Sequence, residues 1–271
     1  MSEEANLDAY LKRINYSGSI APTLETLELL HQRHPAVIPF ENLDSLMDVP
    51  VRLQLSDLVQ KLIVERRGGY CFEQNLLFKA ILETLGFGVE GLAARVLWNR
   101  APGEEAPINH MVLLVDVGGV PYLADLGFGG QVATGPLRLK ADLEQTTPNE
   151  RYRLVAGGPD WRLETEINGE WRPVYGFDLA PQTMDDFVAL NDAAMLEMRD
   201  FLRAARVEGP KRYALRGARF RIHEKGETTT RMLTSTSEMR DVLTGTFGIQ
   251  LPATDKLEPA LEKELLRRDG A

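Results

Sequence analysis

The hydrophobic periodicity of this 271-residue chain changes twice along the sequence, and these changes constrain the fold more than any other feature. Up to about Phe87, apolar residues recur every three or four positions, as they do on one face of a helix. From Gly88 to about Tyr175 they fall in short runs separated by turn residues, which is typical of β-strands. After Pro181 both patterns occur. The sequence therefore predicts an α+β fold with a helical region (1–87), a β region (88–182) and a mixed α/β region (183–271).

Four helices are predicted in the first region from their caps and breakers. The side chains of Asn6 and Thr23 can cap the first two helices, and Pro35 is expected to stop the second. Ser56 opens a third helix, and the glycines at 68–69 separate it from a fourth. The expected helices cover residues 6–13, 24–34, 56–66 and 71–85.

The β region is expected to contain several short strands joined by tight turns. The glycines at 118–119 and the Asn-Gly pair at 168–169 are strong signals for two-residue hairpins. Short strands connected in this way favour a small barrel or sandwich. The expected strands cover residues 89–98, 110–117, 120–125, 152–155, 161–167 and 171–175.

The last region is predicted to combine helices with a β segment. Thr183 and Asp186 resemble a capping box at the head of a long helix that runs to about Arg206. A β segment follows at 213–232, with a turn near Gly226. Two further helices are expected, at 237–243 and 257–268.

Composition and charge exclude several classes of protein. The chain has 31 basic and 40 acidic residues and a net charge of −9, which argues against a general nucleic-acid binder. The polar, acidic N-terminus does not resemble a secretory signal, and no apolar run is long enough to span a membrane. A single cysteine excludes an internal disulfide, and with four scattered histidines it argues against a metal site. We therefore expect a cytoplasmic protein without a metal ion and without nucleic-acid or membrane partners.

Cys71, the only cysteine, follows two arginines, two glycines and a tyrosine at the expected start of a helix. A helix N-terminus and basic neighbours stabilise a thiolate, which is the nucleophilic form of cysteine. The glycines allow a sharp turn and a close approach to a substrate, and backbone N–H groups here can hold an oxyanion. The alternative is a buried cysteine that serves only as a small apolar residue.

His110 and Asp125 are predicted to lie on one face of a β-hairpin. If the glycines at 118–119 form its turn, Asp125 lies opposite Val112, which shares a strand face with His110. Asp125 is then a diagonal neighbour of His110, about 7–8 Å away at the backbone and within reach of its side chain. A nucleophilic cysteine needs a base and a group that orients the base, so we expect Cys71, His110 and Asp125 to act together. Taken singly, the histidine and the aspartate can each have a structural role instead.

The other histidines are expected to be structural. His31 and His34 fall near the end of a predicted helix, where a cation suits the helix dipole. His223 lies beside a predicted turn.

The segment at 66–75 (RRGGYCFEQN) resembles the active-site motif of the arylamine N-acetyltransferases. Four more segments resemble the same family and occur in the expected order: 22–27 (PTLETL), 38–43 (IPFENL), 94–98 (ARVLW) and 124–130 (ADLGFGG). The likeness is close from about residue 7 to 182 and looser afterwards. It implies an N-terminal helical bundle, a central β-barrel and a C-terminal α/β lid.

The resemblance also implies a catalytic triad of Cys71, His110 and Asp125, similar to that of cysteine proteases, and ping-pong kinetics. Cys71 would take an acetyl group from acetyl-CoA as a thioester and pass it to an arylamine, hydrazine or arylhydroxylamine. Acetyl-CoA would be a co-substrate, and no tightly bound cofactor is expected.

The resemblance further implies residues that contact the substrates. The aromatic positions would line the acceptor pocket or border it, and the two glycines would let the pantetheine arm approach the backbone. Plain core packing is the alternative for the aromatic residues. The implied residues are Phe40, Tyr70, Trp98, Phe128, Gly129 and Gly130.

Two departures from the family pattern leave other activities open. Residues 187–196 read as a continuous helix where the family usually has aromatic and Ser/Thr-rich sequence, and Asn109 replaces an expected hydroxyl residue. A related acyltransferase or amide synthase with another donor or acceptor is compatible with this change, as is a hydrolase that uses water. A non-catalytic thiol protein is the alternative outside enzymes. The sequence leaves the physiological acceptor, the acyl chain and the oligomeric state open.

Overall fold

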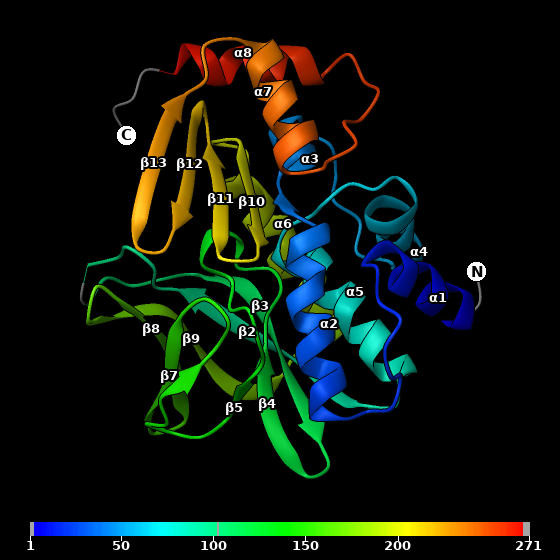
Figure 1. Ribbon diagram of the computed structural model, residues 1–271, viewed down its shortest axis with the longest axis vertical. Helices are drawn as coiled ribbons and strands as arrows, with labels where there is room; N and C mark the ends of the chain where they lie inside the picture. The colour runs from blue at the N-terminus through cyan, green and yellow to red at the C-terminus, as the bar shows by residue number, and fades with distance from the viewer. Residues whose placement is uncertain (1–2, 102, 268–271) are drawn as a thin grey trace.

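The computed structural model describes residues 3–101 and 103–267 and has three parts (Figure 1). Helices of the N-terminal third lie beside a strongly curved eight-stranded sheet. A five-stranded sheet lies above both, and the C-terminal helices cover its end. These parts give the α+β architecture that the sequence predicts.

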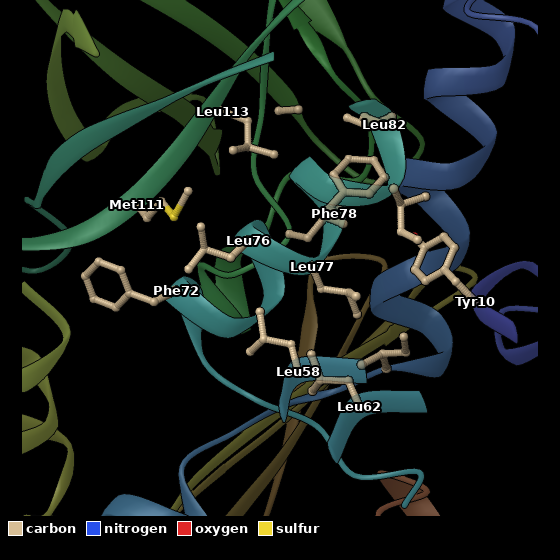
Figure 2. Close-up of a cluster of buried hydrophobic side chains, with 14 of the residues drawn as sticks. Tyr10, Leu58, Leu62, Phe72, Leu76, Leu77, Phe78, Leu82, Met111 and Leu113 are labelled. Carbon is tan, nitrogen blue, oxygen red and sulfur yellow. The ribbon is translucent and has the colours of Figure 1, made fainter. Parts of the chain in front are cut away.

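The helical part is built around α5 (Cys71–Thr84). Leu77 and Phe78 lie four and three positions before Ile81. All three are at most 2% exposed and belong to the same cluster of buried apolar side chains as Tyr10 (Figure 2). Each such side chain stabilises the fold by about 1.5–3 kcal/mol relative to an exposed one. The other elements of this part are α1 (Glu3–Arg13), α2 (Leu24–Val37), β1 (Phe40–Glu41), α3 (Leu43–Leu46), α4 (Leu55–Leu58) and a π-helical turn η1 (Val59–Val64).

The first helix and the end of the second differ from the prediction. The α1 helix already begins at Glu3, so Asn6 is not its cap. Thr23 does cap α2, because its hydroxyl accepts a hydrogen bond from the Thr26 N–H at 3.3 Å. Pro35 does not stop α2, which continues to Val37. A proline so close to the C-terminus removes only one helical hydrogen bond, and burial of its ring offsets that loss.

The third helix also differs from the prediction. It begins at Leu55, one residue before Ser56, and after Leu58 its hydrogen bonding becomes π-helical as far as Val64. The π-helical turn ends at Val64, shortly before residues 66–70, which precede Cys71.

The eight-stranded sheet curls into a nearly closed barrel (Figure 1). Its strand order is β5-β4-β3-β2-β9-β8-β7-β6, and neighbouring strands are antiparallel. Both predicted hairpins are confirmed, with positive φ at both turn residues of 118–119 and 168–169. The strands are β2 (Gly88–Val96), β3 (Ile108–Val117), β4 (Val120–Ala124), β5 (Leu137–Arg138), β6 (Gln145–Thr146), β7 (Arg151–Gly157), β8 (Asp160–Ile167) and β9 (Glu170–Pro181).

The third part connects back to the first through a strand pair. In the five-stranded sheet the order is β1-β10-β11-β12-β13, so β1 lies at one edge, with Phe40 paired to Ala205. The elements are α6 (Met184–Met198), β10 (Arg203–Glu208), β11 (Lys211–Arg216), β12 (Arg219–Glu224), β13 (Glu227–Met232), α7 (Thr236–Asp241), a π turn η3 (Val242–Thr246) and α8 (Leu257–Leu266).

The long helix predicted to reach Arg206 is wrong. The capping box of Thr183 and Asp186 is present, but α6 ends at Met198, and Arg206 lies in β10. The side chain of Asn42 accounts for the change, because its Nδ2 donates to the carbonyls of Met198 and Phe201, both at 2.7 Å. These bonds satisfy carbonyls that a helix end leaves free, and the chain turns into the sheet.

The β segment predicted at 213–232 has two turns rather than one. Gly217, with a φ of +56°, ends β11, and Gly226 lies between β12 and β13. The last predicted helix is observed up to Leu266, and Arg268 lies outside the described residues. Within the described part of the chain, no helix is both long and apolar enough to cross a membrane.

Candidate active site

Two adjacent glycines place Cys71 at the first position of α5. A Cβ atom on Gly68 would lie 2.1 Å from the carbonyl oxygen of Pro39, so only glycine allows the chain to pass there. The next residue, Gly69, bridges to Phe40 and accepts a hydrogen bond from the Glu41 N–H at 3.1 Å. The nucleophile turn, residues 66–70, is thereby fixed against β1.

Buried ion pairs hold this turn. The Arg67 guanidinium binds Glu41 at 2.9 Å and Asp44 at 2.6 Å. Lys61 binds Glu73 at 2.6 Å, and the second oxygen of that carboxylate accepts the Tyr70 N–H at 3.1 Å. This corrects one expectation: the charge of Arg67 is directed to carboxylates rather than to the thiol.

His110 and Asp125 meet as the hairpin register predicts. The observed pairing of Val117 with Val120 and of Leu113 with Ala124 is the register expected from the glycine turn. His110 Nε2 lies 2.7 Å from Asp125 Oδ2, and both side chains are almost completely buried. The structure therefore places His110 and Asp125, two of the three predicted catalytic residues, in direct contact.

The imidazole of His110 also reaches Cys71. The Cys71 side chain is one of the groups that raise the pKa of His110, so it lies within interaction range of the ring. Because Asp125 occupies Nε2, Nδ1 is the ring nitrogen left for the thiol. Cys71 is 3% exposed, and its Sγ lies 3.9 Å from the carbonyl oxygen of Asn109. The basic group beside the cysteine is therefore this histidine.

Electrostatics favour a charged imidazole in this position. Burial by itself lowers the pKa of His110, but the Asp125 carboxylate and the hydrogen bonds to Asp125 and Cys71 outweigh it and raise the pKa to about 10. Burial would raise the pKa of Asp125, yet His110, Asn75 and the Gly127 N–H hold it below the usual value. A thiolate opposite this imidazolium would form a buried ion pair.

Asn109, where the sequence departs from the family pattern, points its side chain away from the thiol. Its Oδ1 accepts the Val96 N–H at 3.3 Å, and its Nδ2 donates to Glu197 on α6 at 3.0 Å. The residue therefore ties β3 to the helix that also departs from the pattern, and only its carbonyl faces Cys71.

Four of the predicted substrate-contacting residues lie at or beside the 3₁₀ turn at 129–131, and one of them contacts the imidazole. The Phe128 ring meets that of His110 edge-on, with centroids 5.3 Å apart. A Cβ on Gly129 would lie 3.4 Å from the Phe40 ring, so these two positions are in contact. Gly130 follows in the same short 3₁₀ turn, and its carbonyl accepts a hydrogen bond from Arg212.

The other two predicted contact residues lie elsewhere. Tyr70 is fully buried in the helical core, where its hydroxyl donates to Asn191 of α6. Trp98 packs against the barrel core beneath the guanidinium of Arg172, 5.3 Å away. A hollow of about 510 Å³ on the outer wall of the barrel, around Gly176, contains none of the predicted site residues.

Asn75 is a buried polar residue of the site that is not among the residues predicted from the sequence. Its Nδ2 donates to Asp125 at 3.0 Å and to the Met111 carbonyl at 2.7 Å, and its Oδ1 accepts the Leu126 N–H. Its spacing could have indicated this role, because Asn75 lies one helical turn after Cys71 and so shares its helix face.

His31 and His34 are structural but not as predicted. Both are completely buried rather than charged at a helix end. Burial lowers the pKa of His31 to about 4 and that of His34 to about 3. Neither contributes a favourable charge to the helix dipole, because both stay neutral.

We expect the free energy of unfolding to fall as the pH drops from about 6.5 towards 4. An unfolded chain protonates His31 and His34 near pH 6.5, whereas the folded protein keeps them neutral to about pH 4 and 3. Their contribution is therefore complete above pH 6.5 and decreases below it by up to about 2.7 kcal/mol per pH unit. Urea denaturation at pH 7, 6 and 5 measures this slope, and His34→Gln should reduce it by about half. A slope unchanged by His34→Gln contradicts the assignment.

The contribution of His110 to the free energy of unfolding has the opposite pH dependence. Because its pKa in the folded protein is raised to about 10, its contribution to stability is complete below about pH 6.5 and is lost as the pH rises towards 10.

Across residues 3–101 and 103–267, the structure has no group of three or more His, Cys, Asp or Glu side chains arranged to hold a metal ion. The chemistry of the site is that of a thiol, an imidazole and a carboxylate, which together suit nucleophilic attack on a carbonyl group.

Known proteins share both the sequence and the fold. A family model described as N-acetyltransferase matches residues 23–256. An arylamine N-acetyltransferase of Mycolicibacterium smegmatis is 40% identical over 258 residues, which cover 91% of this chain and 92% of that protein. One from Escherichia coli strain K12 is 44% identical over 185 residues, which cover 68% of this chain and just under two thirds (66%) of that protein.

A solved structure extends the likeness to three dimensions. The structure of Mycobacterium marinum arylamine N-acetyltransferase in complex with CoA superposes with a TM-score of 0.91 at 37% identity. The match covers 95% of this chain and 98% of that one, so it includes the helical part, the barrel and the C-terminal part.

Proposed function

Because the chain belongs to the arylamine N-acetyltransferase family and is an acyltransferase, we propose that it carries an acetyl group from acetyl-CoA to an aromatic amine through a thioester on Cys71. The observation that carries this proposal is the buried hydrogen bond between His110 and Asp125, next to Cys71, the only cysteine of the sequence. The CoA complex of the M. marinum relative supports the choice of donor.

In the first half-reaction the Cys71 thiolate attacks the thioester carbonyl of acetyl-CoA. His110, charged and held by Asp125, stabilises the thiolate before attack and gives its proton to the departing CoA sulfur. The N–H of Cys71, at the first position of α5, has no acceptor within the helix and can stabilise the oxyanion.

In the second half-reaction the amine attacks the acetyl-Cys71 thioester. His110 is now neutral and takes the proton that the nitrogen loses, and the Cys71 thiolate leaves. Burial of Cys71 and His110 keeps most water from the thioester, which favours transfer to the amine over hydrolysis.

The aromatic acceptor binds beside His110. The Phe128 ring, against His110, and the Phe40 ring, against Gly129, offer flat apolar surfaces that suit an aromatic ring. The glycine turn at 129–130 then provides a backbone free of side chains for the pantetheine arm.

The mass of the intact protein tests the proposal. After incubation with acetyl-CoA we expect a gain of one acetyl group, and an aminobenzoate should remove it while forming the acetylated amine. Because the chain has one cysteine, enzyme first alkylated with iodoacetamide is a site-specific control that should gain nothing. An acetyl group lost equally fast without amine indicates a hydrolase, and no gain at all on a thiol that alkylates readily excludes acetyl-CoA as the donor.

Gly127→Ala is expected to lower kcat/KM for acetyl transfer by about 10- to 100-fold. A Cβ at this position would lie 2.3 Å from the Cα of Cys71, so the loop that carries Asp125 has to move away from the nucleophile. Gly245→Ala is the matched control, because a Cβ there meets no atom within 4 Å and the residue is exposed. Wild-type kcat/KM in Gly127→Ala would show that the loop position is not critical.

A further inference from the structure

The backbone that carries Asp125 has left the β-ladder and is held by side chains. The Asp125 N–H donates to His31 Nε2 at 3.2 Å, and the Leu126 N–H donates to Asn75 Oδ1 at 2.9 Å. The Gly127 N–H donates to Asp125 Oδ1 at 2.8 Å. The position of the Asp125 backbone therefore depends on α2, through His31, as well as on α5.

The hydrogen bond from the Asp125 N–H to His31 Nε2 determines the protonation state and the tautomer of His31. An N–H can donate to Nε2 only if that nitrogen is unprotonated, so the proton of the neutral ring is on Nδ1. The side chain is completely buried, and its ring contacts Phe78 edge-on, with centroids 6.2 Å apart. A charged imidazolium would lose the bond to Asp125.

His34, one helical turn further along α2, reaches the other half of the site through Gln74. The Gln74 Nε2 donates to the carbonyls of Pro39 at 2.8 Å and Gly69 at 3.0 Å, so its Oε1 is the acceptor for His34 Nε2 at 2.5 Å. His34 Nδ1 is then unprotonated and accepts from the Tyr10 hydroxyl at 2.9 Å. The chain of bonds ends on the turn that precedes Cys71.

We propose that His31 and His34 are paired positioning residues, which as neutral rings on one face of α2 set the Asp125 loop and the nucleophile turn at a fixed distance from each other. The inference rests on the proposed function. Residues three apart share a helix face, so one rigid element carries both bonds. Small displacements of reacting groups can slow catalysis by about 100-fold, which gives this arrangement its importance.

Substitutions of His31 separate the acceptor from the bulk of the ring. His31→Leu fills the space without an acceptor, whereas the amide oxygen of His31→Gln can occupy the place of Nε2. For His31→Leu we expect kcat for acetyl transfer to fall by about 10- to 100-fold, with KM for the amine within about twofold of wild type. His31→Gln should recover kcat to within about threefold. His34→Leu and His34→Gln should show the same contrast, because glutamine can still donate to Gln74.

Leu30→Ala is the matched packing control. Leu30 is a fully buried neighbour on the same helix, and its side chain has no polar atoms. The Leu30→Ala variant should lower the melting temperature at least as much as His31→Leu does, but it should leave kcat of the folded enzyme unchanged. If kcat follows the melting temperature across all five variants, the histidines act only through stability and the proposal is overturned.

Alkylation of Cys71 by iodoacetamide provides a readout that needs no acyl donor. A displaced Asp125 stabilises the His110 imidazolium less, so the acid limb of the alkylation rate should move to higher pH in His31→Leu and return in His31→Gln. An alkylation profile identical to wild type in His31→Leu overturns the proposal. If wild type alkylates normally but accepts no acetyl group, the proposed function fails, and the shift in this profile still decides the role of His31.

Discussion

Cys71→Ser is expected to abolish acetyl transfer, with a loss of at least about 10⁴-fold in kcat/KM. Serine fits the space of the 3%-exposed thiol, so the fold should persist. However, a hydroxyl does not ionise opposite His110 as a thiol can, and the buried ion pair that would prepare the nucleophile is lost. Intact-protein mass after incubation with acetyl-CoA should show no adduct.

The controls for this variant separate chemistry from folding. The circular dichroism spectrum should stay close to that of wild type. The melting temperature should fall by no more than about 10 °C, since one sulfur-to-oxygen change in a buried site costs about 1–3 kcal/mol. Cys71→Ala should be as inactive as Cys71→Ser. Acetyl transfer above about 1% of wild type in either variant would place the acyl intermediate somewhere other than residue 71.

Asp125→Asn should reduce kcat by about 10³- to 10⁴-fold while leaving the shape of the site unchanged. The Asp125 Oδ1 already accepts from Asn75 and from the Gly127 N–H, so an asparagine keeps its oxygen there and places its NH₂ group toward His110 Nε2. His110 Nε2 must then be an acceptor, and the ring proton moves to Nδ1, the nitrogen that faces Cys71. A ring in that tautomer cannot accept the proton of the thiol.

The pH dependence of kcat/KM measures this effect. Asp125 raises the pKa of His110 in wild type, so Asp125→Asn should lose this stabilisation of the imidazolium, and the pH profile of kcat/KM should differ from that of wild type. Asp116→Asn is the matched control, since this exposed aspartate lies at the far end of the same hairpin, where its carboxylate accepts a hydrogen bond from the Gly119 N–H of the turn. A kcat for Asp125→Asn within about tenfold of wild type would mean that the carboxylate does not fix the histidine tautomer.

Part of the site can be predicted from the sequence because it depends on the backbone conformation of nearby residues. The two glycines at 118–119 adopt positive φ at both turn positions, which selects a two-residue hairpin and sets its register. Because side chains alternate along strands, that register is enough to bring His110 and Asp125 together. Cys71 at a helix start follows in the same way from Gly68, a position where no side chain fits.

The predictions from sequence are wrong where a residue far away in the chain determines the local structure or the partner of a side chain. The helix expected to reach Arg206 ends at Met198 because Asn42, 156 residues earlier, binds its last carbonyl. Arg67 lies four residues before Cys71 in the sequence but pairs with Glu41 and Asp44, which sequence proximity to the thiol does not reveal. Helical period and capping signals describe a segment alone and contain no information about such partners.

The sequence by itself determined the succession of a helical, a β and a mixed region, the hairpin that pairs the histidine with the aspartate, and the single cysteine at a helix start. Only the tertiary structure decided how these pieces meet. The hydrogen bond from the Asp125 N–H to His31 joins residues 94 positions apart, and the neutral state of that histidine follows from complete burial. Burial and long-range hydrogen bonds exist only after the chain has folded, so no local pattern could have specified them.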